Sequence, residues 1–395
     1  RTTKIKLENF KFIPYGRQDI TEGDIEAIVK VLRSDFLTQG PAVPIFEQRL
    51  CAYTRSKYAV AVNSCTSALH IACLALELGP GDVLWTSPIT FVASANCALY
   101  CGATVDFVDV DADNALMSVE KLKEKLEWAE KEGKLPKIVI PVHFAGQPCD
   151  MREIYDLSQQ YDFKIIEDAA HAIGAKYNDE PVGNCRYSDI TVFSFHPVKI
   201  ITTGEGGVAI TNSLQLAEKM KLLRSHGITR DPDKMHNSLK GPWYYEQIEL
   251  GFNYRMTDIQ AALGISQLDR LNHYISRRLK IVEWYDNQFK DMPISSFFQK
   301  TDRSSAHHLY VIMVNGAQDM RDNLYKHLYN SGIGVNIHYI PVGSQPFHRK
   351  PLKSNTVIAD SIYSKIISLP IFPHITNNEL TYIFNKVSSF LIKKE

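Results

Sequence analysis

The sequence has no paired cysteine motif, no net charge and no long apolar run. Its seven cysteines are odd in number and none stands in a CxxC pair, so a disulfide framework is improbable and we expect a reducing, cytoplasmic setting. The 44 lysines and arginines balance 44 aspartates and glutamates, which argues against a nucleic-acid or anionic-membrane partner. No apolar run reaches the ~20 residues that a membrane-spanning helix needs. The first residues, RTTKIKLENFKF, lack the apolar stretch of a signal peptide.

Several motifs that would indicate another chemistry are also absent. The chain contains no GxGxxG, GxxxxGK[ST], GxSxG or HExxH segment, which counts against dinucleotide-binding, P-loop, α/β-hydrolase and zincin functions. Asp109, Asp111, Asp113 and Glu120 match ligand positions of a calcium loop, but Asn114 stands where that loop needs glycine. A strand rather than a helix is expected before it, so we predict no metal site.

Short apolar segments alternate with helical ones through most of the chain. The expected strands lie at 58–62, 83–86, 104–110, 137–142, 164–167, 189–195 and 207–211. This alternation predicts an α/β fold with a mostly parallel sheet covered by helices on both faces. Near the N-terminus, Thr21 can cap a helix with Asp24 three residues on, and its expected apolar face is formed by Ile25, Ile28, Val29 and Leu32.

The pattern changes in the last third of the chain. A long helical stretch begins near residue 257, and a smaller α+β region follows Pro293, with strands expected at 308–314 and 335–339 and helices at 320–331 and after residues 357 and 377. We predict a large domain over residues 15–292 and a small C-terminal domain over 293–395. Segment 1–14 is expected to pack with either of them. His307 and His308 form a lone pair without ligand spacing, so we expect a structural or edge role for them.

Small hydroxyl residues follow the first expected strand, at the point where open α/β sheets bind ligands. Ser64, Thr66 and Ser67 open the next helix, and free N–H groups at a helix start suit a phosphate. Ordinary helix capping by Ser64 or Thr66 explains the same residues. Both interpretations remain open at this point.

Two charged residues follow later strands. Asp168 comes after KIIE, where a carboxylate can keep a pyridine nitrogen protonated, although capping of the next segment would also explain it. Lys199 follows SFHPV, and burial there would lower its pKa and free its amine for attack on a carbonyl. The alternative is a surface lysine beside a hairpin turn. His171, in the turn after Asp168, could equally be a core histidine.

Together these segments resemble the DegT/StrS-type family of sugar-nucleotide aminotransferases, from about residue 15 to past residue 370. The matching segments are FLTQG (36–40), NSCTSAL (63–69), SPITFVASAN (87–96), EDAAHAIGA (167–175), FSFHPVKIITTGEGG (193–207), LRSHGI (223–228), GFNYRMTDIQAALG (251–264) and HYIPV (338–342). The resemblance implies a fold type I, aspartate-aminotransferase-like transferase that uses pyridoxal 5′-phosphate. It also implies a homodimer whose active sites are shared between subunits.

The resemblance also implies roles for individual residues. Lys199 is similar to the Schiff-base lysine, Asp168 to the partner of the pyridine nitrogen, His171 to a neighbour of the ring hydroxyl, and Phe91 to the aromatic residue that stacks on the ring. The residues expected at the cofactor phosphate are Thr66, Ser67 and Ser194, with Asn253 reaching the phosphate in the neighbouring subunit. The residues expected to line the sugar-nucleotide site are Tyr15, Thr38, Gln39, Arg255, His338 and Tyr339.

Within the family, the SFHPVK, LRSHGI and HLY segments are most similar to the branch that serves pseudaminic acid biosynthesis. That resemblance implies transfer of an amino group from glutamate to C4 of a UDP-linked 4-keto-6-deoxy-N-acetyl hexose. Amination at C3, or synthesis of 4-amino-arabinose, would use the same cofactor residues. A non-catalytic sugar-sensing regulator on the same fold is a further alternative, whereas a dehydratase is disfavoured because such relatives replace the lysine with histidine.

Overall fold

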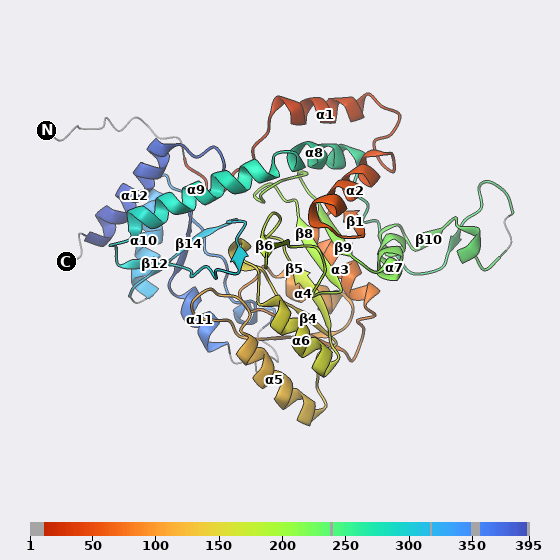
Figure 1. Ribbon diagram of the computed structural model, residues 1–395, viewed down its shortest axis with the longest axis horizontal. Helices are drawn as coiled ribbons and strands as arrows, with labels where there is room; N and C mark the ends of the chain where they lie inside the picture. Colours follow the sequence, from red (N-terminus) through yellow and green to blue (C-terminus); the bar gives the residue numbers. More distant parts are fainter. Residues whose placement is uncertain (1–11, 238–239, 317, 349–355, 393–395) are drawn as a thin grey trace.

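The computed structural model describes residues 12–237, 240–316, 318–348 and 356–392. A seven-stranded sheet lies at its centre, in the order β1-β9-β8-β5-β4-β2-β3 (Figure 1). Its strands are β1 (Tyr58–Val62), β2 (Val83–Thr86), β3 (Thr104–Phe107), β4 (Ile138–Ile140), β5 (Lys164–Asp168), β8 (Ile190–Ser194) and β9 (Gly207–Thr211). β9 runs antiparallel to β1 and β8, whereas β2–β3, β2–β4, β4–β5 and β5–β8 pair in parallel. The predicted mostly parallel α/β sheet is therefore confirmed.

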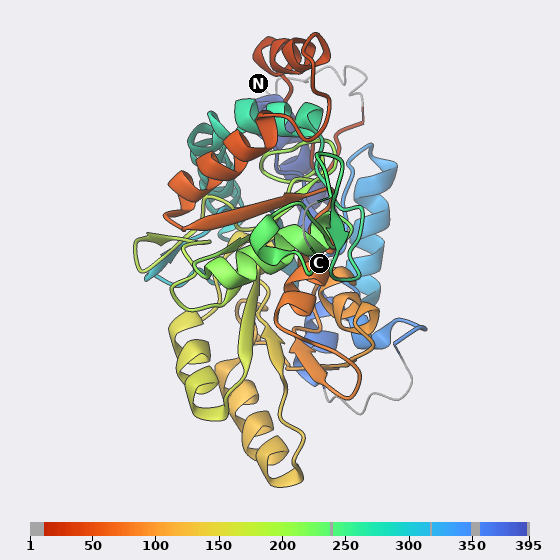
Figure 2. The same cartoon turned by 90° about the vertical axis from the view of Figure 1, so that its right-hand side faces the viewer.

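Helices cover both faces of this sheet (Figure 2). On one face α3 (Cys65–Ala75), α4 (Ala93–Tyr100) and α7 (Leu214–Arg224) pack against alternate strand residues such as Val60 and Val192. The other face carries α2 (Ala42–Thr54), α5 (Val119–Glu132), α6 (Met151–Tyr161) and α8 (Asp258–Leu268). Successive strand side chains point to opposite faces, so burial on both sides explains why the sequence shows continuous apolar runs.

The N-terminal helix α1 (Glu22–Leu32) begins at the predicted cap, with Thr21 and Asp24 forming a capping box. The helix lies along α8 (Figure 1). Its expected apolar face is not the buried one, because Ile25 and Leu32 are 45% and 54% exposed. The buried residue is Asp24, whose Oδ2 accepts hydrogen bonds from Arg270 at 2.6 Å and Gln267 at 2.9 Å. A buried polar anchor thus overrides the apolar periodicity.

The C-terminal part is built on a three-stranded antiparallel sheet of β12 (Ile294–Ser296), β14 (Tyr310–Val314) and β15 (Ile366–Leu369). The helices α10 (Gln318–Asn330), α11 (Val357–Tyr363) and α12 (Asn377–Ile392) accompany it. The single long helix expected from residue 257 is in fact two helices, α8 and α9 (Leu271–Phe289).

The prediction of a strand at 335–339 is wrong. Asn336 forms only an isolated bridge to Ser368, and the strand beside β14 is β15, which the sequence analysis missed. Side chains explain the difference, because Asn336 Oδ1 accepts from the Ile337 N–H at 2.8 Å and His338 Nδ1 bonds Ser368 Oγ at 2.8 Å. Such local bonds compete with a strand ladder.

Helix α9 ends just before the predicted domain boundary and contributes side chains to the cores on both sides of it. Leu271 and Tyr274 belong to the core around α2 and α8, whereas Tyr285 and Phe289 belong to the core of the C-terminal sheet. Ile13 joins that second core, and its N–H donates to the Gly332 carbonyl at 2.9 Å. The described end of segment 1–14 therefore packs with the C-terminal region, while residues 1–11 lie outside the described residues. The boundary at residue 293 stays a prediction.

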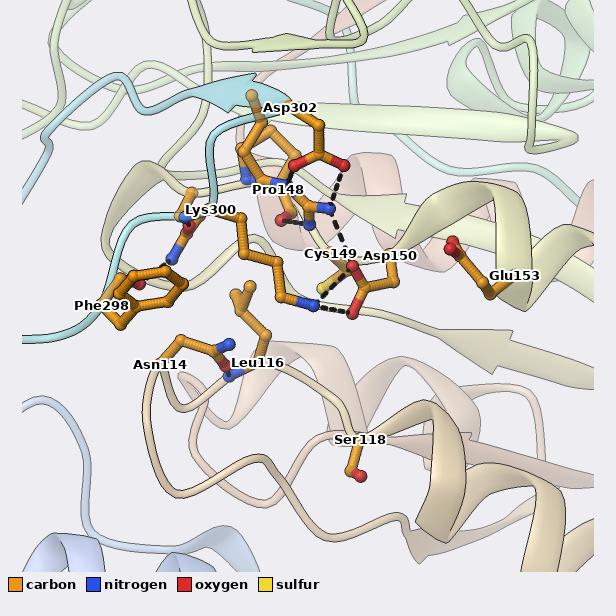
Figure 3. Close-up of polar contacts among 12 residues, drawn as sticks. Asn114, Leu116, Ser118, Pro148, Cys149, Asp150, Glu153, Phe298, Lys300 and Asp302 are labelled. Atoms are coloured by element: carbon orange, nitrogen blue, oxygen red, sulfur yellow. Dashed lines mark hydrogen bonds and ion pairs between the residues drawn. The ribbon is translucent and has the colours of Figure 1, made fainter.

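After β12 the chain returns to the large sheet before entering β14 (Figure 3). Lys300 Nζ contacts both carboxylate oxygens of Asp150, at 2.8 and 2.7 Å, and Arg303 contacts Oδ1 at 2.8 Å. Arg303 also donates to the Pro148 carbonyl at 2.8 Å. Short strands complete the junction, because β13 (Arg303–Ser304) pairs with β6 (Lys176–Tyr177). We call residues 297–309 the return segment.

The loop that matched a calcium motif has a structural role in the described chain. Both Asp109 oxygens accept N–H groups at the start of α11, from Ile358 at 2.9 Å and Ala359 at 3.0 Å. Asn114 Oδ1 accepts from the Leu116 N–H at 2.9 Å. Among the helices that the structure describes, none combines the length and the apolarity needed to cross a membrane.

Candidate active site

Two of the predicted site residues lie at the carboxyl edge of the large sheet. Asp168 ends β5 and Ser194 ends the neighbouring parallel strand β8. Both are buried. Because parallel strands deliver their carboxyl ends to the same edge, the segments that follow them meet there.

Lys199 lies in the turn after β8, where its N–H donates to the His196 carbonyl at 2.9 Å. Its side chain is partly buried. Burial lowers the pKa of Lys199 to about 8, although the negative forms of Cys65 and Asp168 act in the opposite direction. About a tenth of this amine is therefore neutral at pH 7 and about half at pH 8, and the neutral form is the one that acts as nucleophile and proton acceptor.

Asp168 is held in a fixed orientation by hydrogen bonds to both carboxylate oxygens. Ser94 Oγ donates to Oδ2 at 2.6 Å, and the Ala170 N–H donates to Oδ1 at 3.1 Å. Ser94 Oγ is in turn 2.7 Å from Thr90 Oγ1. This hydroxyl pair, formed by Thr90 before α4 and Ser94 in its first turn, thus orients the carboxylate at the end of β5.

The buried side chains of His143 and Glu167 form a pair next to Asp168. His143 Nε2 is 2.7 Å from Glu167 Oε2, and the Cys149 N–H donates to His143 Nδ1 at 3.1 Å. With Nδ1 accepting, the proton resides on Nε2 and is donated to Glu167. Burial alone would raise the pKa of Glu167, but hydrogen bonds from His143, Ser188 and Thr191 lower it. The pair joins the ends of β4 and β5, because the His143 N–H also donates to the Asp168 carbonyl at 3.0 Å.

His171 is buried beside these groups and contacts Tyr339. Its Nε2 lies 3.0 Å from the Tyr339 hydroxyl, and its Nδ1 is buried without a hydrogen-bond partner. Burial, with added repulsion from Lys199 and His338, lowers the pKa of His171 well below its usual value, so the ring is neutral. Phe91, predicted to stack on the cofactor, is 61% exposed and its ring lies 6.4 Å from that of Tyr339.

The expected phosphate cradle lies at the start of α3. Ser64 caps this helix by accepting from the Ser67 N–H at 3.1 Å, and Ser67 Oγ donates to Asn63 Oδ1 at 2.7 Å. The capping interpretation is therefore correct for Ser64. Gly207 lies against the helix start, where an added Cβ would be 2.5 Å from the Cys65 nitrogen. The phosphate contacts of Thr66, Ser67 and Ser194 stay predictions.

The GFNYR loop runs along the same helix start. The Asn63 N–H donates to the Tyr254 carbonyl at 2.9 Å, and Arg255 forms a bridge with Val62. Asn253 is exposed, and its carbonyl accepts from Asn63 Nδ2 at 3.4 Å. Its side chain is thus available to a second subunit, and the predicted contact with a neighbour's phosphate remains a prediction.

The structure brings together some of the predicted substrate residues. The rings of Tyr15 and His338 lie 5.3 Å apart, and His338 precedes Tyr339, which contacts His171. Burial, followed by repulsion from Lys199, lowers the pKa of His338 to about 3.

The other predicted substrate residues lie on a separate exposed loop. Thr38 and Gln39 are exposed, and Thr38 bridges Thr257, two residues after Arg255. Asp258 holds this loop by accepting from the Gly40 and Ala42 N–H groups, each at 2.9 Å.

The sequence analysis missed several residues that belong to this site. They are Thr90, Ser94, His143, Glu167 and His308. Thr90 and Ser94 carried a signal, since both fall in the SPITFVASAN segment that matches the family. His308 was given a structural or edge role, whereas its ring lies 4.4 Å from that of His171.

Comparison with known proteins identifies the family. A family model described as the DegT/DnrJ/EryC1/StrS aminotransferase family matches residues 18–388. The chain belongs to this family. It is 37% identical over 384 residues to the UDP-4-amino-4,6-dideoxy-N-acetyl-beta-L-altrosamine transaminase of Campylobacter jejuni, covering 96% of this chain and 98% of that protein.

Solved structures of family members share the whole fold. Helicobacter pylori PseC, an aminotransferase involved in the biosynthesis of pseudoaminic acid, superposes with a TM-score of 0.89 at 29% identity and covers 97% of this chain and 100% of its own. The putative sugar aminotransferase Spr1654 of Streptococcus pneumoniae, in its PMP-form, superposes with a TM-score of 0.87 at 31% identity. The match covers 96% of this chain and 99% of that chain. Spr1654 has also been solved in a PLP-form. The chain is thus a sugar aminotransferase with the fold type I architecture, and its cofactor is pyridoxal phosphate.

The residues present fit this cofactor. A partly neutral lysine, an oriented buried carboxylate and a buried histidine nitrogen without a partner lie at one sheet edge, at Lys199, Asp168 and His171. Buried nitrogens in native proteins are almost always hydrogen-bonded, so the unpartnered nitrogen of His171 fits a polar group of the cofactor. A helix start with bare N–H groups, at α3, is available for the phosphate.

Proposed function

We propose that this enzyme transfers an amino group from glutamate to C4 of a UDP-linked 4-keto-6-deoxy-N-acetyl hexose, in the synthesis of pseudaminic acid or a related surface glycan. The observation that carries the proposal is the full-length match, at 37% identity over 96% of the chain, to a transaminase of that sugar class. The structural match to PseC, at a TM-score of 0.89, supports it.

The arrangement of polar groups supports an amino transfer at this edge of the sheet. Pyridoxal phosphate, when bound, supplies the electron sink and carries the amino group between donor and acceptor. Lys199 holds or releases a proton at Nζ, which its lowered pKa permits near neutral pH. Asp168, oriented by Ser94, would keep the ring nitrogen of the bound cofactor protonated. Thr66, Ser67 and Ser194 bind its phosphate.

Aromatic and histidine side chains form the side of the site that we assign to the sugar nucleotide. Tyr15, His338 and Tyr339 contact one another there, and the low pKa of His338 keeps that ring neutral near pH 7. Neutral hydrogen-bonding rings suit sugar hydroxyl and keto groups better than charged side chains do, because they need not be stripped of strongly bound water. Thr38, Gln39 and Arg255 complete the site from the neighbouring loops.

The assembly that we propose is a homodimer in the cytoplasm, with each site completed by Asn253 of the other subunit. The exposed position of Asn253 beside the start of α3 supports this arrangement. The absence of CxxC cysteine pairs in the sequence supports the cytoplasmic location.

The decisive experiment is incubation of the pure enzyme and glutamate with a panel of UDP- and dTDP-linked keto-sugars, followed by NMR of the products. We expect a single 4-amino sugar from the UDP-linked 4-keto-6-deoxy-N-acetyl hexose. Lys199→Ala is the matched control and should give none. A 3-amino sugar, or a product only from a keto-pentose, would replace the proposed substrate with that of a related aminotransferase. Turnover of no sugar by cofactor-loaded protein would favour the sugar-sensing regulator.

A further inference from the structure

Three rings form a continuous contact through the site, and one of them has no assigned role. His308, in the return segment, lies with its ring 4.4 Å from that of His171 at an interplanar angle of 43°. His171 in turn is hydrogen-bonded through Nε2 to the Tyr339 hydroxyl, with their planes 19° apart. Both His171 and His308 are buried.

The position of His308 is fixed by contacts to its backbone and not to its ring. Arg278, fully buried on α9, donates through Nη1 to the carbonyls of His307 at 3.2 Å, His308 at 3.1 Å and Ile371 at 3.2 Å. On the other side, Gly146 lies so close that an added Cβ would be 3.1 Å from the His308 nitrogen. The backbone at residue 308 is therefore clamped between α9 and the loop after β4.

Among the described residues, Nδ1 of His308 has no hydrogen-bond partner, and the His308 ring contacts that of His171 instead. Nδ1 of His308 and Nδ1 of His171 are both buried without a partner. Within the described part of the chain, the His171 ring therefore has a single hydrogen bond, to Tyr339, and one bond leaves a ring free to turn about its side-chain torsions. What restricts that rotation is packing, by Phe144 at 6.4 Å and by His308 at 4.4 Å between ring centroids.

We propose that His308 is a positioning residue of the active site. Its ring holds that of His171 in the one orientation that keeps Nε2 on the Tyr339 hydroxyl and Nδ1 toward the cofactor. The proposal rests on the site being the aminotransferase centre described above, and not on which sugar is aminated. Because His308 enters from the return segment, this contact makes the alignment of the site depend on how that segment sits against the large sheet.

A double-mutant cycle tests whether His308 acts through the His171–Tyr339 pair. The variants are His308→Ala, Tyr339→Phe and their combination, compared by kcat and KM. A misaligned group in a site of this kind costs roughly 10–100-fold in rate. We expect each single variant to lose kcat in that range with little change in KM, and the double variant to be no slower than the slower single variant. Losses that multiply would overturn the proposal, since independent effects add in free energy.

A second measurement is independent of activity. In the cofactor-free protein labelled with ¹⁵N-histidine, the His171 ring signals can be assigned by their loss in His171→Gln. We expect neutral-imidazole signals that do not change from pH 6 to 8 in the parent protein, and titrating signals after His308→Ala opens the space beside the ring. Unchanged His171 signals in His308→Ala would overturn the proposal even if the enzyme proved to act on an unexpected sugar.

Two further variants separate positioning from folding. His327→Ala removes a partly buried histidine of α10 whose Nε2 also lacks a partner, and it should leave kcat and the His171 signals unchanged. If it alters them as His308→Ala does, the effect is general and the proposal is wrong. Should His308→Ala fail to fold, His308→Gln fills the space without a ring and takes its place in both experiments.

Discussion

Ser94 Oγ donates a 2.6 Å hydrogen bond to Oδ2 of Asp168. The two residues lie 74 positions apart in the chain, at the start of α4 and the end of β5. Asp168 is therefore oriented before any cofactor binds, because a second bond from the Ala170 N–H fixes its other oxygen. Such preorganisation removes the reorganisation that a mobile carboxylate would require during the reaction.

Replacing either residue should slow the reaction without releasing the cofactor. Asp168→Asn keeps the shape but loses the charge that holds the pyridinium proton, and we expect a fall in kcat of roughly 10²-fold or more. Ser94→Ala removes one hydrogen bond to a charged group, about 1.5–3 kcal/mol, so a roughly tenfold or greater loss follows. Stopped-flow kinetics at saturating cofactor measure both. Turnover at the parent rate by Asp168→Asn would refute the assigned role.

Lys199 should be the site of covalent attachment, and its capture of cofactor should depend on pH. With its pKa near 8, about a tenth of the amine is neutral at pH 7, against roughly one part in 2,500 for an unperturbed lysine. Because the neutral form reacts, capture should speed up as pH rises and level off above about pH 8. Absorbance changes after mixing cofactor-free protein with pyridoxal phosphate give the rate.

Borohydride reduction and peptide mapping then locate the linkage. We expect the modified peptide to contain Lys199, and Lys199→Ala to carry no covalent cofactor. Lys164→Ala is the matched control, since Lys164 is exposed at the other end of β5 and should label normally. Attachment to any other lysine would show that the site has been assigned to the wrong residue.

Mixed dimers test whether each active site is completed by Asn253 of the other subunit. An Asn-to-phosphate hydrogen bond is charge-assisted, so Asn253→Ala should weaken cofactor binding by about 1.5–3 kcal/mol. When inactive Lys199→Ala and Asn253→Ala homodimers exchange subunits, a heterodimer has one site with both defects and one with neither. Activity should therefore partly return. Heterodimers verified by mass spectrometry that remain inactive would show that Asn253 acts within its own chain.

Asp150 should be important for stability, because it holds the return segment (Figure 3). The Arg303 side chain is only 2% exposed and keeps Asp302 and the Pro148 carbonyl as partners, so Asp150→Ala removes one of its two carboxylate contacts and should cost about 1.5–3 kcal/mol. Lys300→Ala should cost at most about 1 kcal/mol, since that side chain is 31% exposed. Urea unfolding of the cofactor-free protein measures both. Equal losses for the two variants would contradict the buried-charge argument.

The sequence alone predicted those features that depend on local pattern. The strands expected at 164–167 and 189–195 end within one residue of the observed ends at Asp168 and Ser194, and the capping box at Thr21 lies where it was expected. Contacts across long chain separations were not predictable in this way. The His171–Tyr339 bond joins residues 168 positions apart, and only the folded sheet determines that they meet. Strand β15 was missed because four residues carry too weak a periodic signal.

The return segment determines whether this protein can be divided into two fragments that fold separately. A cut at residue 293 would separate Asp150 from Arg303, and it would remove Phe297 and Leu309 from the core that they share with α5 and α6. Neither fragment would have a complete apolar interior, so neither should fold well when expressed alone. Co-expressed, the two pieces would instead behave as halves of a split protein, which reassemble because each supplies the surface that the other lacks.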